Sequence, residues 1–263
     1  MPHVRMLVAA LVSMLPLAGG ARAAVKVQEI AYEQGGTPLK GFLAYDDAVK
    51  GKRPGVLVIH EWWGLNDYAR EQARRLAEAG YVAFAADMYG NGKVAKHPAD
   101  AQAFVAEATK DPGVVAARFD AAMAVLGRQP RVDASRVAAV GYCFGGGVAL
   151  RMARAGAPLA AVATFHAAVP PPAPVEKGTV KPEILIQTGG ADPMVPVPKV
   201  ETFADELKAA GAKVDVVVYP EARHSFTVPG ADREGMEGLR YDPDAAKKSW
   251  TRMIEFFRRV LKA

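Results

Sequence analysis

The chain has 263 residues, of which 51% are hydrophobic, 23% are charged and one is cysteine, and its formal net charge is +5. This fraction of hydrophobic residues is high enough to form a core, which excludes an intrinsically disordered chain. A single cysteine excludes a disulfide framework within the chain and a cysteine-cluster metal site. The excess of positive charge is small and dispersed, so we expect no nucleic-acid partner.

Residues 1–23 have the three parts of a secretory signal peptide. Arg5 precedes an apolar run over residues 6–17, and the small-x-small triplet Ala21-Arg22-Ala23 follows. A membrane anchor is the alternative, but the run is too short to span about 30 Å of hydrocarbon as a helix. We therefore expect export to the periplasm or out of the cell, and a mature form that is not bound to a membrane.

Residues 24–263 alternate between strand and helix patterns. An antiparallel pair is predicted first, over residues 25–32 and 39–45 around Gly35-Gly36. Continuous apolar runs, typical of strands buried on both faces, then alternate with segments of helical spacing. The predicted strands are 54–60, 82–87, 136–141, 159–165, 183–188 and 213–219, and the predicted helices are 67–79, 100–109, 114–126, 145–155, 197–210 and 244–261.

This alternation predicts an α/β fold with a mostly parallel, doubly wound sheet and helices on both faces. No linker interrupts the pattern, so we expect residues 24–263 to form a single domain. In such sheets the functional site lies beyond the carboxyl ends of the strands. Candidate catalytic residues are therefore expected just after strands.

Cys143 is the candidate nucleophile. It lies in Gly141-Tyr142-Cys143-Phe144-Gly145, between a predicted strand and a predicted helix. This is the nucleophile-elbow pattern with Cys where Ser is usual, and its glycines permit the sharp turn. The N-terminus of the following helix favours thiolate over thiol. An inert buried cysteine is the alternative, but the flanking glycines favour the nucleophile.

The base and its acidic partner are expected in the chain order nucleophile, acid, histidine. His224 follows the last predicted strand, and Asp192 ends the segment Gly189-Gly190-Ala191-Asp192 after the strand before it. In these roles His224 takes the thiol proton and later activates water, while Asp192 fixes the tautomer of His224. A turn-forming Asp192 and a surface His224 are the alternatives, but their order and positions favour catalysis.

The segment His60-Glu61-Trp62-Trp63-Gly64 follows the strand 54–60, where this arrangement supplies an oxyanion-binding N–H group. We assign the two oxyanion donors to the backbone N–H groups of Trp62 and Phe144. The zinc signature is excluded because Gly64 stands where its second His would be. The tryptophans could instead be core residues. Glu61 beside them is costly unless it is paired.

Four motifs together resemble the dienelactone hydrolase family: GYCFGG around Cys143, HEWWG around Glu61, GGAD ending at Asp192 and ARHSF around His224. The similarity extends over essentially the whole mature chain. The resemblance implies the α/β-hydrolase fold and a Cys143–His224–Asp192 triad that acts on small esters or lactones. It also implies that no metal or cofactor takes part.

The resemblance further implies that Glu61 modulates the nucleophile. In the family the matching carboxylate can meet the resting thiol and moves when substrate binds. A carboxylate about 4 Å from a thiolate disfavours the charged pair by up to about 4 kcal/mol at an effective dielectric near 20. Glu61 near Cys143 would therefore keep a protected thiol, and Glu61 moved away would release the thiolate.

The sequence also departs from the family. Its carboxylate-gripping arginines are missing, because Asn91 stands at one expected position, with Lys93 two residues on, and Val228 stands at the other. The triad therefore carries over, whereas specificity for dienelactone does not. His166, which follows the strand 159–165, is expected to be a structural histidine.

The predicted function is hydrolysis of a small ester or lactone through an acyl-enzyme intermediate on Cys143, by a protein that we expect to be a monomer. One alternative is thioester hydrolysis or acyl transfer through the same cysteine. Another is a non-catalytic hydrolase fold used for binding.

Overall fold

The strands of the protein form one eight-stranded sheet in the order β1-β2-β4-β3-β5-β6-β7-β8, as seen in a computed structural model that describes residues 25–262. The predicted signal peptide lies outside the described residues. The strands are β1 (Val25–Gln34), β2 (Thr37–Asp46), β3 (Arg53–Ile59), β4 (Val82–Ala86), β5 (Val132–Tyr142), β6 (Ala161–Phe165), β7 (Glu183–Gly189) and β8 (Val214–Tyr219). The helices are α1 (Asp67–Glu78), α2 (Pro98–Thr109), α3 (Pro112–Gly127), α4 (Phe144–Arg154), α5 (Val197–Ala209), the short 3₁₀ helix η1 (Ala231–Glu234) and α6 (Pro243–Leu261).

The sheet is mostly parallel, as predicted. The β1–β2 hairpin is antiparallel, and β2 joins the sheet antiparallel to β4. Every other neighbouring pair of strands is parallel. Strands β3 and β4 are buried at every residue, which explains why their sequences are continuous apolar runs rather than alternating ones.

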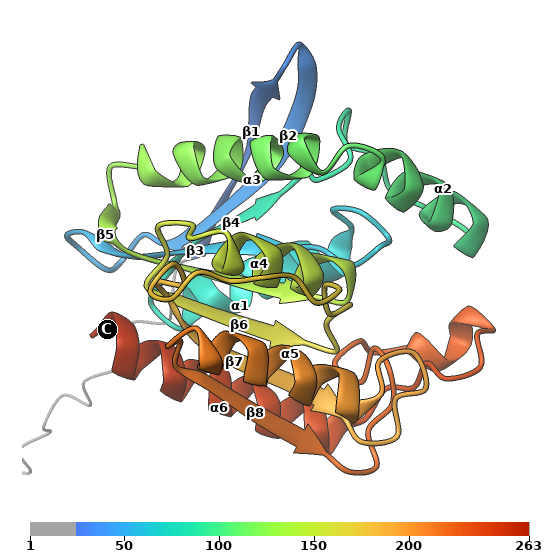
Figure 1. The fold of residues 1–263 in the computed structure, drawn as a ribbon. Coiled ribbons are helices and arrows are strands. Elements are labelled where there is room, and N and C mark those ends of the chain that lie inside the picture. Colours follow the sequence, from blue (N-terminus) through green and yellow to red (C-terminus); the bar gives the residue numbers. More distant parts are fainter. Residues whose placement is uncertain (1–24, 263) are drawn as a thin grey trace, which may run out of the picture.

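Helices cover both faces of the sheet. Figure 1 shows α3, α4 and α5 lying across the near face, with α1 and α6 behind. The helices of the near face pack over Leu57 and Ile59 of β3. Those of the far face pack over Val56 and Val58 of the same strand. Successive residues of one strand thus enter two different hydrophobic cores, because side chains alternate across a sheet.

Helix starts lie close to the predicted positions, and local chemistry explains the differences. Helix α1 begins at the predicted Asp67 and is capped by Asn66, whose side chain accepts a hydrogen bond from the amide of Ala69 at 3.2 Å. The helices α2, α3 and α6 begin on Pro98, Pro112 and Pro243, one or two residues before the predicted starts. Proline fits there because the first-turn N–H has no acceptor within the helix.

The parallel strands bring several loops together at their carboxyl ends. Glu61 follows β3, Cys143 follows β5, His166 follows β6, Asp192 follows β7 and His224 follows β8. This edge of the sheet is where α/β folds place their ligands. Across residues 25–262, no helix is both long and apolar enough to cross a membrane.

Candidate active site

Cys143 occupies a tight turn between β5 and the first residue of α4. Its backbone has φ 49° and ψ −115°, an unusual conformation for a residue other than glycine. A Cβ atom on Gly141 would lie 2.2 Å from the carbonyl oxygen of Gly145, and one on Gly145 would lie 2.3 Å from that of Ile59. Both contacts are with backbone that cannot yield, so the elbow requires these two glycines, as the sequence predicts.

The three predicted triad residues form one line of hydrogen bonds. His224 Nε2 lies 3.1 Å from Cys143 Sγ, and His224 Nδ1 lies 2.8 Å from Asp192 Oδ2. The other carboxylate oxygen, Asp192 Oδ1, accepts hydrogen bonds from the amides of Met194 at 2.8 Å and Val195 at 3.0 Å. Asp192 is therefore held by the turn that follows β7, and it fixes the orientation of the imidazole.

Close backbone contact joins the loops that carry Asp192 and His224. Gly190 N donates to the carbonyl of Tyr219 at 2.8 Å, and Ala191 N donates to that of Ala222 at 3.1 Å. A Cβ atom on Gly189 would lie 2.2 Å from the oxygen of Ala222. The glycine pair before Asp192 thus lets one loop lie directly against the other, which brings acid and histidine into contact.

The surroundings of His224 favour its charged form. Burial lowers the pKa of its imidazole, but the sulfur of Cys143 and the carboxylate of Asp192 outweigh burial and raise the pKa to about 10. An imidazolium beside a sulfur stabilises the thiolate electrostatically. The geometry can therefore hold an ion pair between the two side chains.

The backbone N–H group of Trp62 belongs to the loop after β3, and that of Phe144 directly follows Cys143. Phe144 is the first residue of α4, whose N–H has no acceptor within the helix. Among the hydrogen bonds of residues 25–262, none is donated by either amide. The carbonyl of Trp62 accepts a hydrogen bond from the hydroxyl of Tyr89 at 2.8 Å, which fixes this loop.

His60 also stabilises the loop after β3 through both nitrogens of its ring. Its Nε2 accepts a hydrogen bond from the amide of Met88 at 3.2 Å, and its Nδ1 contacts the carbonyl of Glu61. Burial lowers the pKa of His60, so the ring is neutral and Nδ1–H is the donor. The side chain of Trp63 packs with Ala95 and Ala101, so packing accounts for that tryptophan.

Glu61 lies buried beside the loop after β8 that carries His224, called the histidine loop below. Its Oε1 accepts a hydrogen bond from the hydroxyl of Ser225 at 2.9 Å, and the same oxygen lies 3.8 Å from Nδ1 of His166. Sequence reasoning did not single out Ser225 as a partner of this carboxylate, although it follows His224 directly. The contact joins residues 164 positions apart in the chain, so no local pattern could have indicated it.

The positions that lack the family's arginines are occupied as follows. Lys93 is directed to Glu107, with 2.7 Å between Nζ and a carboxylate oxygen. Val228 lines a small cavity of about 160 Å³ with Glu61, Trp63 and Ser225. Within the described chain, no cluster of three or more His, Cys, Asp or Glu side chains could hold a metal ion.

Backbone strain is concentrated at these loops. In residues 25–262, five residues other than glycine have positive φ, and three of them, Cys143, His166 and Ser225, lie at the carboxyl edge of the sheet beside His224. Such conformations persist only where the surrounding structure imposes them, and they cluster at functional sites.

A parallel sheet with a sharp strand-to-helix turn, a histidine after the last strand and an acid after the strand before it defines the α/β-hydrolase class. Within that class, residues 39–261 match the dienelactone hydrolase family. The chain belongs to this family and is an enzyme of the ester and lactone hydrolase type.

Several known proteins are similar to this chain. A carboxymethylenebutenolidase candidate of Methylorubrum extorquens is 32% identical over 218 residues, which cover 79% of this chain and 72% of that protein. The crystal structure of a dienelactone hydrolase-like promiscuous phosphotriesterase from metagenomic libraries is 38% identical, with a TM-score of 0.86, and the match covers 90% of this chain and 99% of that one. A structure titled m3DLH is 41% identical with the same TM-score and the same coverage.

Proposed function

We propose that the chain hydrolyses small esters or lactones through an acyl-enzyme intermediate on Cys143. The observation that carries this proposal is the line of hydrogen bonds from Cys143 through His224 to Asp192. It supplies a nucleophile, a proton carrier and a group that orients the carrier, in the geometry that acyl transfer needs.

In the first step Cys143 Sγ attacks the carbonyl carbon of the substrate, and the carbonyl oxygen becomes an oxyanion. The amides of Trp62 and Phe144 are the proposed donors to this oxyanion. As the tetrahedral intermediate collapses, the carbon–oxygen bond of the ester breaks and His224 gives its proton to the leaving alkoxide. In a lactone that alkoxide remains tethered to the acyl group.

In the second step a water molecule attacks the thioester carbon. His224, now neutral, takes a proton from the water, and the thiolate leaves as the carboxylic acid product forms. Asp192 stabilises the imidazolium in both steps. Glu61 is the proposed modulator of the nucleophile, because its carboxylate lies in the loop next to the oxyanion donors.

The test is a panel of small aryl esters and lactones assayed with the wild type and with Cys143→Ala. We expect turnover by the wild type, no turnover above background by Cys143→Ala, and a transient mass increase on the peptide that contains Cys143. Equal turnover by both proteins would contradict the proposed nucleophile.

The same intermediate could pass its acyl group to an acceptor other than water. Turnover of thioester substrates would reveal thioesterase activity, and added alcohols or amines would reveal acyltransferase activity as a change of product at an unchanged rate of acylation. An aryl phosphotriester belongs in the panel because one similar structure is named as a promiscuous phosphotriesterase. A binding protein without catalysis would turn over none of these substrates.

We also propose that residues 1–23 direct export and are removed. Expression of the full chain in a Gram-negative host should give a periplasmic protein that begins at or near residue 24. N-terminal sequencing of the purified protein and cell fractionation check this. An intact Met1 on protein recovered from the cytosol would contradict it.

A further inference from the structure

A buried chain of polar groups lies behind the histidine loop. The hydroxyl of Tyr68 donates to Thr227 Oγ1 at 2.7 Å, and Thr227 Oγ1 lies 3.1 Å from His166 Nε2. On the opposite side of its ring, His166 Nδ1 lies 3.8 Å from Glu61 Oε1, the oxygen that accepts the Ser225 hydroxyl. The groups come from α1, from the loop after β6, from the loop after β8 and from the loop after β3.

The direction of these hydrogen bonds defines the tautomer of His166. Burial raises the pKa of Tyr68 well above its usual value, so Tyr68 keeps its proton and donates to Thr227. The Thr227 hydroxyl can then donate its own proton to His166 Nε2, which leaves the ring proton on Nδ1. That proton faces the Glu61 carboxylate.

The burial and the backbone conformation of His166 both cost free energy. Its side chain is fully buried, and its backbone has φ 38°, in a region that residues other than glycine rarely adopt. Within residues 25–262 its Nδ1 has no hydrogen-bond partner, and the acidic oxygen of Glu61 is 3.8 Å away. A buried donor so placed needs an acceptor, and a shift of the carboxylate by about 1 Å would supply it.

We propose that His166 is a positioning residue that, through its Nδ1–H, holds the Glu61 carboxylate on Ser225 and away from Cys143, with the Tyr68–Thr227 pair fixing its tautomer. This inference rests on the proposed role of Cys143 as nucleophile.

The other ionisable groups near Cys143 show why the position of the Glu61 carboxylate affects the thiolate. His224 faces the sulfur from the loop after β8, with Asp192 behind it, and Tyr89 faces the sulfur from the loop after β4. Burial raises the pKa of Tyr89 above its usual range, and burial together with His224 holds that of His166 well below its usual value, so both are neutral. Asp192 is fixed by its hydrogen bonds to His224 and to two backbone amides, so the position of the Glu61 carboxylate is the one that can change how readily the thiolate forms.

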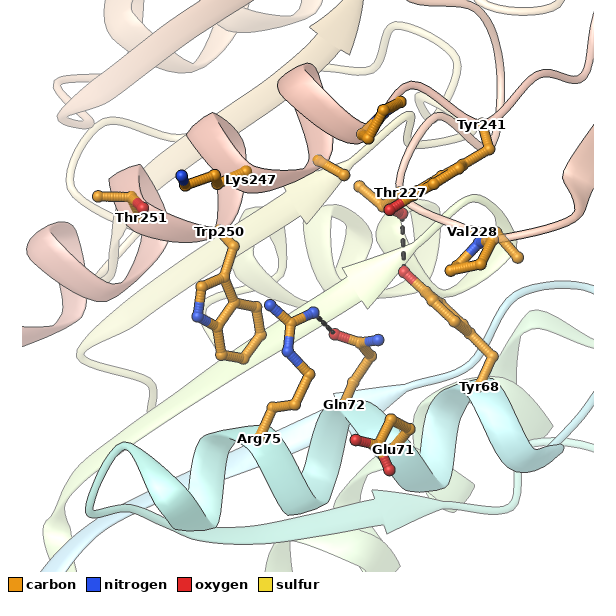
Figure 2. A pocket seen from close by; sticks show the side chains of 13 residues that line it. Tyr68, Glu71, Gln72, Arg75, Thr227, Val228, Tyr241, Lys247, Trp250 and Thr251 are labelled. Carbon is orange, nitrogen blue, oxygen red and sulfur yellow. Dashed lines mark hydrogen bonds between the residues drawn. The ribbon is translucent and has the colours of Figure 1, made fainter.

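The outer end of the polar chain is accessible for mutation without touching the nucleophile. Figure 2 shows Tyr68 and Thr227 joined at one end of a groove of about 730 Å³ between α1 and α6. Farther along, Arg75 stacks on Trp250, 3.7 Å from the ring centre, and donates to Gln72 at 3.1 Å. Thr227 thus belongs both to the wall of this groove and to the support of His166.

The first test compares His166→Leu with His166→Asn in the full chain. The two side chains have nearly the same shape, but only Asn offers an N–H near the position of Nδ1, and Asn tolerates positive φ. Cys143 is the single cysteine, so alkylation by iodoacetamide reports on it alone and requires no substrate. The readout is the pH midpoint of the alkylation rate.

We expect His166→Leu to raise this midpoint by about one pH unit, which is about a tenfold slower alkylation at neutral pH, because the freed carboxylate opposes the thiolate. His166→Asn should stay close to the wild type. Adding Glu61→Gln to His166→Leu should restore the wild-type midpoint. A merely structural role would lower the melting temperature and leave the midpoint in place, which would overturn the proposal.

A second pair keeps the test decisive if His166→Leu does not fold. Thr227→Val removes the hydroxyl at nearly constant shape, and Thr227→Ser keeps it. We expect Val to slow alkylation at neutral pH by about threefold and Ser to match the wild type. Identical midpoints for Val, Ser and wild type would contradict the assigned tautomer. A midpoint shift in a protein that hydrolyses no ester or lactone would support the positioning role and contradict the proposed function.

Discussion

Cys143 combines a strained backbone with three stabilising surroundings: a helix N-terminus, an imidazole and a turn closed by glycines. A non-glycine residue at positive φ costs on the order of 1–3 kcal/mol. The hydrogen bonds from Cys143 N to Phe165 O at 3.1 Å and from Ala168 N to Cys143 O at 2.9 Å hold the residue in this conformation from the end of β6 and the loop after it. The conformation directs the sulfur to His224.

The pH dependence of activity follows from the raised pKa of His224. In the proposed mechanism His224 gives its proton to the leaving group, and the imidazole holds this proton below a pKa of about 10 and loses it above. We therefore expect kcat/KM for an activated ester to stay high on the alkaline side of neutrality and to fall as the pH rises through about 10. A pH profile of the wild type checks this, and an alkaline limb near an ordinary histidine pKa of about 6.5 would contradict it.

Asp192→Asn removes one of the groups that raise the pKa of His224, and it disturbs the tautomer. We expect kcat/KM to fall by about 10²–10³ and the alkaline limb to move to lower pH. The two amide donors, Met194 and Val195, can still bind the Asn oxygen, so the fold should persist. As a matched control, Asp205→Asn changes an exposed acid on α5 and should leave the profile unchanged.

At the scale of elements, the site depends on how closely β3, β5 and α4 approach each other. Gly145 lies against the end of β3, and Gly146 and Gly147 lie against Ala167 and Ala168 after β6. The first turn of α4 therefore contacts two strand ends directly through backbone. This contact, rather than helix propensity, explains three successive glycines in a helix where each costs up to about 1 kcal/mol.

Gly145→Ala tests this contact. The new Cβ would lie 2.3 Å from the oxygen of Ile59 and 2.5 Å from that of His60, so β3 or α4 must shift. We expect a loss of at least about 2 kcal/mol in the free energy of unfolding and a large loss of activity. The control is Gly127→Ala at the end of α3, where nothing lies within 4 Å of the new Cβ and stability should stay equal or rise slightly. Urea unfolding distinguishes the two variants.

At the scale of the whole molecule, the hydrophobic cores and the candidate triad occupy different parts of the sheet. The two hydrophobic cores extend along both faces, whereas the candidate triad lies beyond the carboxyl ends of the strands. Phe257 of α6 is fully buried and packs against Tyr81, with 6.0 Å between the ring centres, and Tyr81 directly precedes β4 at the amino edge. A change there should alter stability without altering the catalytic geometry.

Phe257→Ala should lower the free energy of unfolding by about 3–5 kcal/mol, because it leaves a cavity in the far core. At low temperature, where the variant remains folded, kcat/KM should equal that of the wild type. The control is Val27→Ala on β1, whose side chain is 47% exposed and whose loss should cost less than about 0.5 kcal/mol. A catalytic defect in folded Phe257→Ala would show that the two edges of the sheet are coupled.

Local patterns in the sequence were sufficient for the strands, the helices and the elbow. Buried runs and helical spacing depend on neighbours a few residues apart, and the glycines around Cys143 mark a turn whose geometry is local. The chain order of Cys143, Asp192 and His224 could be predicted for the same reason, since each follows a recognisable strand.

Only the tertiary structure determined which polar groups lie next to one another behind the candidate triad. The register of parallel strands brings Glu61, His166, Ser225 and Thr227 together from three separate loops, and no periodicity connects positions so far apart. His166 was predicted to be structural, and it is indeed buried, but its contacts with Thr227 and Glu61 are nonlocal and no pattern in the sequence indicated them. Sequence defines what can form within one turn or strand, whereas contacts between loops depend on how the whole sheet is assembled.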